Sequence, residues 1–280
     1  MIYTHETAVD FLADCQAFLA LHEAENNLIL GLAGTLSRDP HYYGPQDPLF
    51  LTVHHPSGCV AAILQTPPRN LILYVDSAHI SYAIPLLIQH LWTNHIPVPG
   101  VHGPKAAIEL FVEEWTQLTS QTAKIQFHEM VYKLENVQAV PTVPGKMRQA
   151  EARDLDFLTH WIRAFAAQAL DEMSEEEARK NAERKIREGV LYLWEDEVPV
   201  TMAGWTRPTQ HGVTIAYVYT PTEFRRRGYA TACVAALSEK LLADYDFCAL
   251  FTDLSNPTSN SIYQKIGYKP LEYFLQYGFT

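Results

Sequence analysis

The segment from Gly212 to Leu242, GVTIAYVYTPTEFRRRGYATACVAALSEKLL, constrains this chain more than any other. An apolar strand leads into a short loop of three arginines and Gly228, and the loop opens an alanine-rich helix. A helix start presents unpaired backbone N–H groups and the positive end of the helix dipole. The segment therefore predicts a cradle for an anion such as a phosphate group. The alternative is a solvated basic loop on an ordinary amphipathic helix.

A second segment, NPTSNSIYQKIGYKP from Asn256 to Pro270, favours the cradle. It follows the next predicted strand and again reads as a loop, a short helix and a turn. RRRGYA (225–230) followed by N-P-T-S-N-x-x-Y-x-x-x-G-Y (256–268) closely resembles the GNAT superfamily of acetyl-CoA-dependent N-acetyltransferases. The resemblance covers residues 147–279, roughly half of the chain.

The resemblance implies a site for acetyl-CoA as cosubstrate and none for a metal. In that family a Q/R-x-x-G-x-G/A loop grips the CoA pyrophosphate, and Arg225, Gly228 and Ala230 fill its three defined places. A peptide N–H near Tyr219 would polarise the thioester carbonyl, and Tyr263 would protonate the leaving thiolate. The residues expected to bind acetyl-CoA are Val218, Tyr219, Arg225, Arg226, Arg227, Gly228, Tyr229, Ala230, Thr231, Asn256, Ser259, Asn260 and Tyr263.

The general base is not identified by the sequence. Family members that use a carboxylate often carry it on the strand before the glycine loop, where this chain has Thr214. Deprotonation through water stays open. The side-chain candidates are Asp253, Asp171, Glu172, Tyr217 and Tyr219, although Asp253 is expected to cap the loop at Asn256.

Composition points to a globular protein with two parts. At 280 residues and 48% hydrophobic content, the length allows one large or two modest domains. The net charge of −11 argues against nucleic acid as a partner. Residues 1–145 hold five Lys and Arg against thirteen Asp and Glu, whereas residues 146–280 hold sixteen against nineteen. This shift, with Pro141, Pro144 and Gly145, predicts a linker at 141–146 between domains 1–140 and 147–280.

The order of predicted elements is the same in both parts. After the linker we expect a strand, two helices, three strands, the glycine-loop helix, a strand, a short helix and a last strand. Asp154 is a candidate N-cap of the first helix, and Ser174 with Glu177 has capping-box spacing in the second. Residues 1–140 repeat this order, with one helix predicted at 7–24 before the three strands, but LYVDSAHISYAIP (73–85) replaces the glycine loop. We therefore predict an α/β fold with a mixed sheet and tandem GNAT-like domains, of which only the C-terminal one is intact.

Other signals give mainly negative predictions. Four widely spaced cysteines, Cys15, Cys59, Cys233 and Cys248, read as reduced thiols of a cytoplasmic protein. No leader or membrane-spanning run is recognised. The histidines lack a consistent ligand spacing, so no metal site is predicted. Whether the chain forms a homodimer stays open.

Together these observations predict an N-acetyltransferase that moves an acetyl group directly from acetyl-CoA to a primary amine of a small acceptor. The alternative is a non-catalytic acyl-CoA-binding regulatory module that keeps the fold without turnover. Tyr263 favours the enzyme, and the missing strand carboxylate favours the alternative. The N-terminal domain is expected not to bind CoA.

Overall fold

The computed structural model describes residues 1–168 and 172–280, with the side chains of residues 168 and 257–259 excepted. The chain divides into two compact units that exchange segments. Unit 1 comprises residues 1–132, 251–256 and 270–280, and unit 2 comprises residues 133–250 and 257–269. Within the described part, no helix is both long and apolar enough to cross a membrane.

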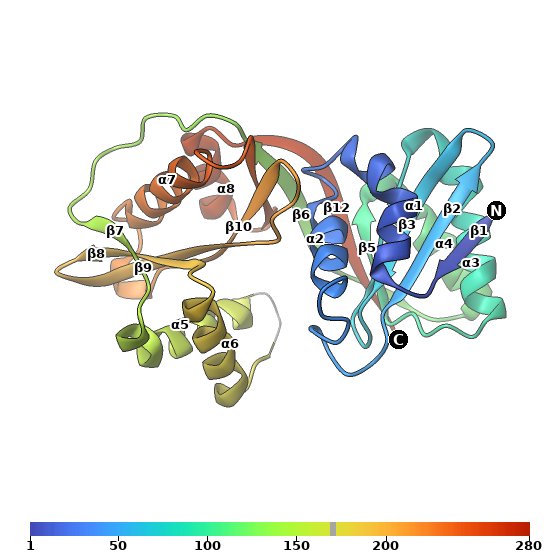
Figure 1. Cartoon of the computed structure of the whole chain (residues 1–280), viewed down its shortest axis with the longest axis horizontal. Coiled ribbons are helices and arrows are strands. Elements are labelled where there is room, and N and C mark those ends of the chain that lie inside the picture. The colour runs from blue at the N-terminus through green and yellow to red at the C-terminus, as the bar shows by residue number, and fades with distance from the viewer. Residues whose placement is uncertain (169–171) are drawn as a thin grey trace. The chain divides into compact units, whose positions relative to one another are not determined.

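The first half of the chain forms ten regular elements and one short 3-10 turn, shown from blue to green in Figure 1. They are β1 (Ile2–His5), α1 (Ala8–Ala20), α2 (Asn27–Leu36), β2 (Leu49–His55), β3 (Gly58–Gln65), β4 (Leu71–Val75), η1 (Ser77–His79), α3 (Ile80–Thr93), β5 (Gly100–Pro104), α4 (Lys105–Thr119) and β6 (Ala123–Leu134).

The second half repeats the order of strands and α-helices of the first. Its elements are β7 (Lys146–Gln149), η2 (Ala152–Asp154), α5 (Leu155–Gln168), α6 (Glu175–Arg187), β8 (Leu191–Asp196), β9 (Val198–Thr206), β10 (Gly212–Tyr219), η3 (Thr222–Phe224), α7 (Tyr229–Leu241), β11 (Phe247–Asp253), α8 (Pro257–Ile266) and β12 (Lys269–Phe279). The predicted repetition of one order of elements is therefore confirmed, as is the mixed α/β fold class.

Each half builds its sheet in the same way. Strands β1 to β4 are antiparallel neighbours, and β5 then joins β4 in parallel. Likewise β7 to β10 are antiparallel neighbours, and β11 joins β10 in parallel. In both halves a helix connects the two parallel strands, α3 in the first and α7 in the second. Such a crossover is what a parallel pair requires.

The last strand of the chain completes the sheet of unit 1. β12 pairs antiparallel with β5, from Phe274 opposite Pro104 to Gly278 opposite Gly100. Figure 1 shows it in red beside the strands of unit 1. Leu275 and Phe279 belong to the hydrophobic core of that unit. Unit 1 therefore depends on a strand that the sequence supplies only after unit 2, and the sequence did not predict this exchange.

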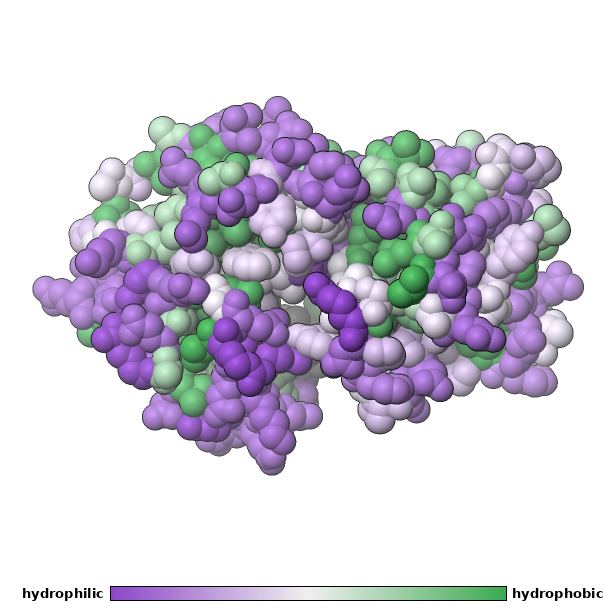
Figure 2. Space-filling view, in the orientation of Figure 1, coloured by the Kyte–Doolittle hydropathy of each residue, from purple (hydrophilic) through white to green (hydrophobic). Residues whose placement is uncertain are grey.

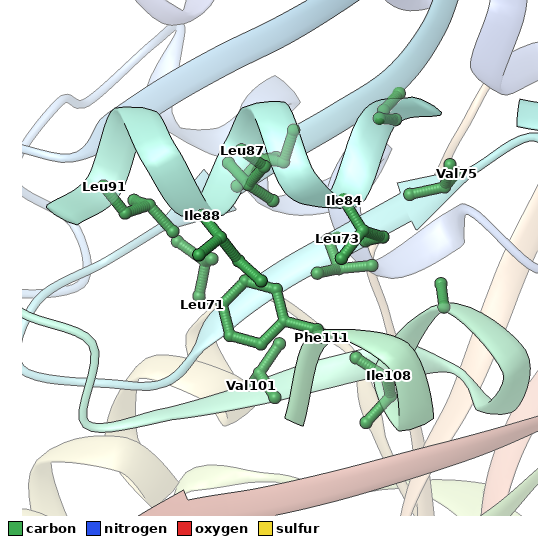
Figure 3. Close-up of a cluster of buried hydrophobic side chains, with 14 of the residues drawn as sticks. Leu71, Leu73, Val75, Ile84, Leu87, Ile88, Leu91, Val101, Ile108 and Phe111 are labelled. Atoms are coloured by element: carbon green, nitrogen blue, oxygen red, sulfur yellow. The ribbon is translucent and has the colours of Figure 1, made fainter. Parts of the chain in front are cut away.

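The core of unit 1 lies between its sheet and the helices α3 and α4. Ile84, Leu87, Ile88 and Leu91 follow the helical repeat of α3 and are at most 4% exposed. Figure 3 shows them pointing toward β4, β5 and Phe111 of α4. Strand β4 has the uninterrupted apolar sequence LILYV because a buried strand of a parallel pair is covered on both faces. A second cluster packs α1 and α2 against the other face of β2 to β4.

In unit 2, α6 forms because its ends are capped and its charges are ordered. Ser174 and Glu177 make the predicted capping box, and the last turn carries Arg184, Lys185 and Arg187. Acidic residues near the N-terminus and basic ones near the C-terminus complement the helix dipole. Gly189 follows the helix at φ 71°, a conformation that glycine adopts without strain. The surface over α6 is largely hydrophilic in Figure 2.

Three local predictions need correction or addition. Asp154 lies in the 3-10 turn η2 directly before α5, where Glu151 is the N-cap and Asp154 is the third residue of its capping box. Asp154 turns back to accept a hydrogen bond from the Glu151 backbone N–H at 2.8 Å. Strand β1 and helix α2 were not predicted, the latter because NLILGLAGTL is apolar almost all round and shows no clear helical face.

We predict that Leu275→Ala destabilises the protein by about 2–5 kcal/mol, the usual cost of a cavity at a buried leucine. Leu275 is 2% exposed, whereas Leu271 on the same strand is 42% exposed and serves as the matched control. Urea unfolding of both variants provides the measurement. Equal, small effects would contradict the placement of β12 in the core of unit 1.

We also predict an acid-sensitive contribution from Asp154, whose side chain is 4% exposed and pairs with Arg148 at 2.6 Å. Burial alone would raise the pKa of Asp154, but hydrogen bonds from Arg148 and from the Glu151 backbone outweigh it and leave the pKa lowered. A carboxyl whose pKa is lower in the folded than in the unfolded protein stabilises the fold fully at pH values above its unfolded pKa. This stabilisation is lost as the pH falls through the folded pKa.

Asp154→Asn should therefore cost about 3 kcal/mol at pH 7, because Arg148 loses a buried partner. The difference from wild type should shrink below about pH 4. Asp156→Asn, which removes an exposed partner of Arg179, is the control and should have little effect at either pH. A difference between Asp154→Asn and wild type that does not change with pH would argue against this account.

Candidate functional site

Strand β10 is interrupted by a bulge near its end. Its register with β9 runs regularly to Ala216 opposite Gly204 and then shifts, so that Tyr219 lies opposite Met202. Two residues of β10 thus face one residue of β9, and Tyr217 takes a left-handed conformation with φ 56°. A bulge of this kind leaves the extra residue outside the ladder and redirects its peptide groups.

The parallel ladder between β10 and β11 is short and ends before the bulge. It joins three residue pairs, from Gly212 with Phe247 to Thr214 with Ala249. β10 nevertheless continues to Tyr219. The last five residues of β10 therefore extend beyond the parallel ladder, and within the described part of the chain no strand pairs with their backbone groups on that side. An extended ligand with amide groups can hydrogen-bond to such a strand segment.

Helix α7 begins at Gly228 without a side-chain cap. Gly228 is the N-cap, at φ 87° and ψ −5°, and has no side chain that could accept from the first-turn N–H groups. The conformation is left-handed, which only glycine adopts readily. Arg226, two residues earlier, is also left-handed at φ 62°. The loop thus turns sharply into a helix whose first N–H groups have no side-chain cap, as an anion site requires.

The three arginines are exposed, and two of them contact their own loop. Arg225 donates from Nε to the backbone oxygen of Thr220 at 2.9 Å, which ties the loop to the residue after β10. The Arg227 guanidinium lies 5.8 Å from the centre of the Phe224 ring. The arginines therefore shape the loop as well as giving it positive charge.

The first turn of α7 has one buried side chain. Tyr229 is 7% exposed, and its hydroxyl donates to Asp196 Oδ2 at 2.5 Å. This hydrogen bond to a carboxylate is the main cause of the raised pKa of Tyr229. Its side chain is thus engaged within unit 2, and its backbone is what remains for a ligand. Ala230 and Thr231, next in the same turn, are half-buried.

Tyr263 lies on α8 and is 8% exposed. Its ring meets the Tyr268 ring edge to face at 5.9 Å, and the Tyr268 hydroxyl lies 2.8 Å from Ser238 Oγ. Burial raises the pKa of Tyr263 to about 12, so the phenol keeps its proton throughout the neutral range. Asn260 on the same helix is half-buried, whereas the Ser259 side chain lies outside the described residues.

The candidate bases lie in different surroundings. Asp253 accepts hydrogen bonds from the backbone and hydroxyl of Ser255 at 2.8 and 2.6 Å, so it caps the turn that leads to the exposed Asn256. Thr214 is buried, Glu172 is exposed, and Asp171 lies outside the described residues. Tyr217 and Tyr219 are half-buried near the bulge.

Unit 1 lacks both special features at the corresponding places. β4 pairs with β3 without interruption, from Ala61 opposite Val75 to Leu64 opposite Ile72. In front of α3, Asp76 stands where unit 2 has the glycine loop, and its carboxylate accepts from the Ala78 N–H at 3.4 Å. A carboxylate at this helix start repels a phosphate. Unit 1 therefore has no comparable anion cradle at this position.

The sequence did not predict that the segment between β6 and β7 lies against the glycine loop of the candidate site. The Gln138 N–H donates to the backbone oxygen of Ile266 at the end of α8 (2.8 Å), and the Pro144 oxygen accepts from Trp194 Nε1 (2.7 Å). Between these contacts, Val143 Cγ1 lies 3.0 Å from where a Cβ on Gly228 would stand. Figure 1 shows this segment as a green loop along α8 and α7. Its prolines and glycine signalled only a linker.

Comparisons with known proteins bear on the fold. Residues 193–275 match the FR47-like protein family. A GNAT-family acetyltransferase from Colwellia psychrerythraea shares 13% identity at a TM-score of 0.60, with both chains fully covered. A GCN5-related N-acetyltransferase from Sphaerobacter thermophilus shares 14% sequence identity at a TM-score of 0.60, and the match covers 99% of this chain and 94% of that one.

A tandem GNAT protein from the clavulanic acid biosynthesis pathway gives 10% identity and a TM-score of 0.54, covering 99% of this chain and 97% of its own. No curated protein matches the sequence. The duplicated element order, the interrupted strand and the glycine-capped helix agree with these likenesses. This protein has the fold of the GNAT N-acetyltransferases, in its tandem form.

Proposed function

We propose that unit 2 is an acetyl-CoA-dependent N-acetyltransferase that acts on a primary amine of a small acceptor. One observation carries the proposal: a bulged strand and a glycine-capped helix follow one another in unit 2. In unit 1 the corresponding strand pairs regularly, and a carboxylate stands at the corresponding helix start. The GNAT fold supports acyl transfer in general, and these two features support it for unit 2 in particular.

The start of α7 suits the pyrophosphate of acetyl-CoA, and the end of β10 suits its amide-containing arm. The pyrophosphate would lie at the start of α7, held by the N–H groups of residues 226–231 and by the positive charge of the arginines. A Cβ on Gly228 would stand only 3.0 Å from Val143 Cγ1, so glycine is what lets the loop keep this conformation against Val143. The amide-containing arm would pair with Val218 and Tyr219 beyond the ladder. Asn256, Ser259 and Asn260 are proposed as further contacts.

Acetyl-CoA supplies an acetyl group on a thiol leaving group. A neutral amine nitrogen bonds to the carbonyl carbon, the carbon–sulfur bond breaks, and its electron pair stays on sulfur. A backbone N–H at the bulge would stabilise the negative charge that develops on the carbonyl oxygen. Tyr263 would give its proton to the sulfur and regain one from solvent, while the proton of the amine leaves through water.

The alternative function has one observation in its favour. Thr214, which replaces the strand carboxylate of some family members, is buried at 1% exposure. A threonine hydroxyl is not a base at neutral pH, so this position supplies no proton acceptor for the amine. If the chain binds acetyl-CoA and transfers nothing, it is a regulatory acyl-CoA-binding module. Release of free CoA from acetyl-CoA, followed with amines, amino acids, polyamines, aminoglycosides and peptides, tests the enzyme directly.

Gly228→Val should weaken CoA binding by at least about 100-fold, because a β-branched residue at φ 87° distorts the loop and its hydrogen bonds are lost. Gly189→Val is the control, since Gly189 at φ 71° carries similar backbone strain at the end of α6. Calorimetry on both folded variants gives the comparison. The control should lose stability and keep its CoA affinity, and equal affinity in Gly228→Val and wild type would refute the cradle.

Tyr263→Phe should lower kcat about 100-fold and leave the Kd of CoA nearly unchanged, because the ring stays and the proton donor goes. Residual activity is expected, since a thiolate is a fair leaving group. Tyr268→Phe is the matched control: it removes the Ser238 contact and should lower stability without lowering kcat. An unchanged kcat in Tyr263→Phe would reduce Tyr263 to a packing residue.

A further inference from the structure

A band of aromatic side chains joins one flank of α5 to the end of β10. Trp161 lies 5.0 Å from Phe157 and 6.0 Å from Tyr219, measured between ring centres. Phe165 lies 5.6 Å from Tyr217 in the same way. The three residues of α5 recur every four positions, so they share one flank of the helix. All five rings belong to unit 2.

This band borders the hydrophobic core of unit 2, and all five of its residues pack against that core. The core face of α5 carries Leu158 and Ile162, which are at most 1% exposed, and Ala166. The five aromatic residues are each only half-buried. The rings are tilted against one another rather than coplanar, and the parts of them that stay exposed offer an apolar surface to a ligand.

The band reaches the place where transfer would occur. Tyr217 and Tyr219 belong to the bulge of β10, whose peptide groups are proposed to hold the thioester carbonyl. An attacking nitrogen must come within roughly 3–3.5 Å of the carbonyl carbon. The group that carries this nitrogen would then lie within reach of the two tyrosine rings. This step rests on the proposed function.

The charges beside the band disfavour a polycation. Lys185 Nζ lies 6.0 Å from the centre of the Tyr217 ring and pairs with Glu188 at 2.8 Å. On α5, Asp156 pairs with Arg179 at 2.9 Å. Both carboxylates are thus already engaged by basic residues, so neither is a ready partner for the second ammonium of a polyamine.

We propose that the acceptor is a monoamine carried by an aromatic or comparably large apolar group, which lies against the rings of Trp161, Phe165, Tyr217 and Tyr219. Polyamines, aminoglycosides and other polycations are poor acceptors for this protein.

Three amines that share a four-carbon arm test the proposal: 4-phenylbutylamine, butylamine and spermidine. Free CoA release by the full chain gives kcat/KM for each, after subtraction of release without amine. Burial of the phenyl group should make kcat/KM for 4-phenylbutylamine at least about 10-fold higher than for butylamine. The kcat/KM for 4-phenylbutylamine should also exceed the kcat/KM for spermidine.

Variants locate the effect. Phe165→Ala and Trp161→Ala should each reduce the ratio of 4-phenylbutylamine to butylamine by several-fold, with the Kd of CoA unchanged. Phe165→Leu keeps an apolar side chain in case the alanine variant does not fold, and should reduce the ratio less. Trp92→Ala, which removes a tryptophan 49% exposed on α3 of unit 1, is the control and should keep the ratio.

Faster acetylation of spermidine or butylamine than of 4-phenylbutylamine would overturn the acceptor assignment and leave the acetyltransferase standing. A preference for 4-phenylbutylamine that survives both alanine variants would also overturn it. CoA binding without release from any of the three amines would contradict the proposed function and the acceptor assignment together.

Discussion

The proposed site depends on one constraint, that strand β10 stops pairing before it ends. Its ladder with β11 closes at Thr214, and the bulge after Ala216 breaks the register with β9. Backbone groups that pair within a sheet cannot bind a ligand, and buried groups left unpaired are costly. The unpaired backbone groups at the end of β10 are therefore explained if a bound ligand forms hydrogen bonds with them. Gly228 completes the arrangement, because its left-handed backbone directs the loop into α7.

The two halves of the chain show how the same order of elements can keep or lose such a site. In unit 1, β4 pairs regularly with β3, and Asp76 caps the start of the 3-10 turn before α3 with its own carboxylate. These two changes remove the open strand segment and the anion cradle and leave the packing of the sheet intact. Unit 1 instead takes β12 into its core through Leu275 and Phe279. The difference between the two units at this place is thus local, and the exchange of β12 makes the fold of unit 1 depend on the whole chain.

Much of this could be predicted from the sequence, for identifiable reasons. Most strands and helices, the capping box at Ser174 and the repeated order follow from apolar periodicity and capping residues, and these predictions were confirmed. The exchange of β12 could not be predicted, since nothing in KPLEYFLQYGF indicates which sheet this strand joins. The bulge at Tyr217 has no glycine to signal it, and the position of Val143 against Gly228 arises from tertiary packing. The roles of Tyr263 and the glycine loop remain predictions, which the geometry supports through burial and helix capping.

Hydrogen–deuterium exchange with and without acetyl-CoA tests the central claim most directly, because it reports on the backbone amides themselves. The account predicts slower exchange for residues 226–231 at the start of α7 and for Tyr217 to Tyr219 at the end of β10 when acetyl-CoA is added. It predicts no change for residues 76–81 before and within α3 of unit 1, where Asp76 stands in place of the cradle. Unchanged exchange in both segments of unit 2 at saturating acetyl-CoA, or protection confined to unit 1, would contradict the account.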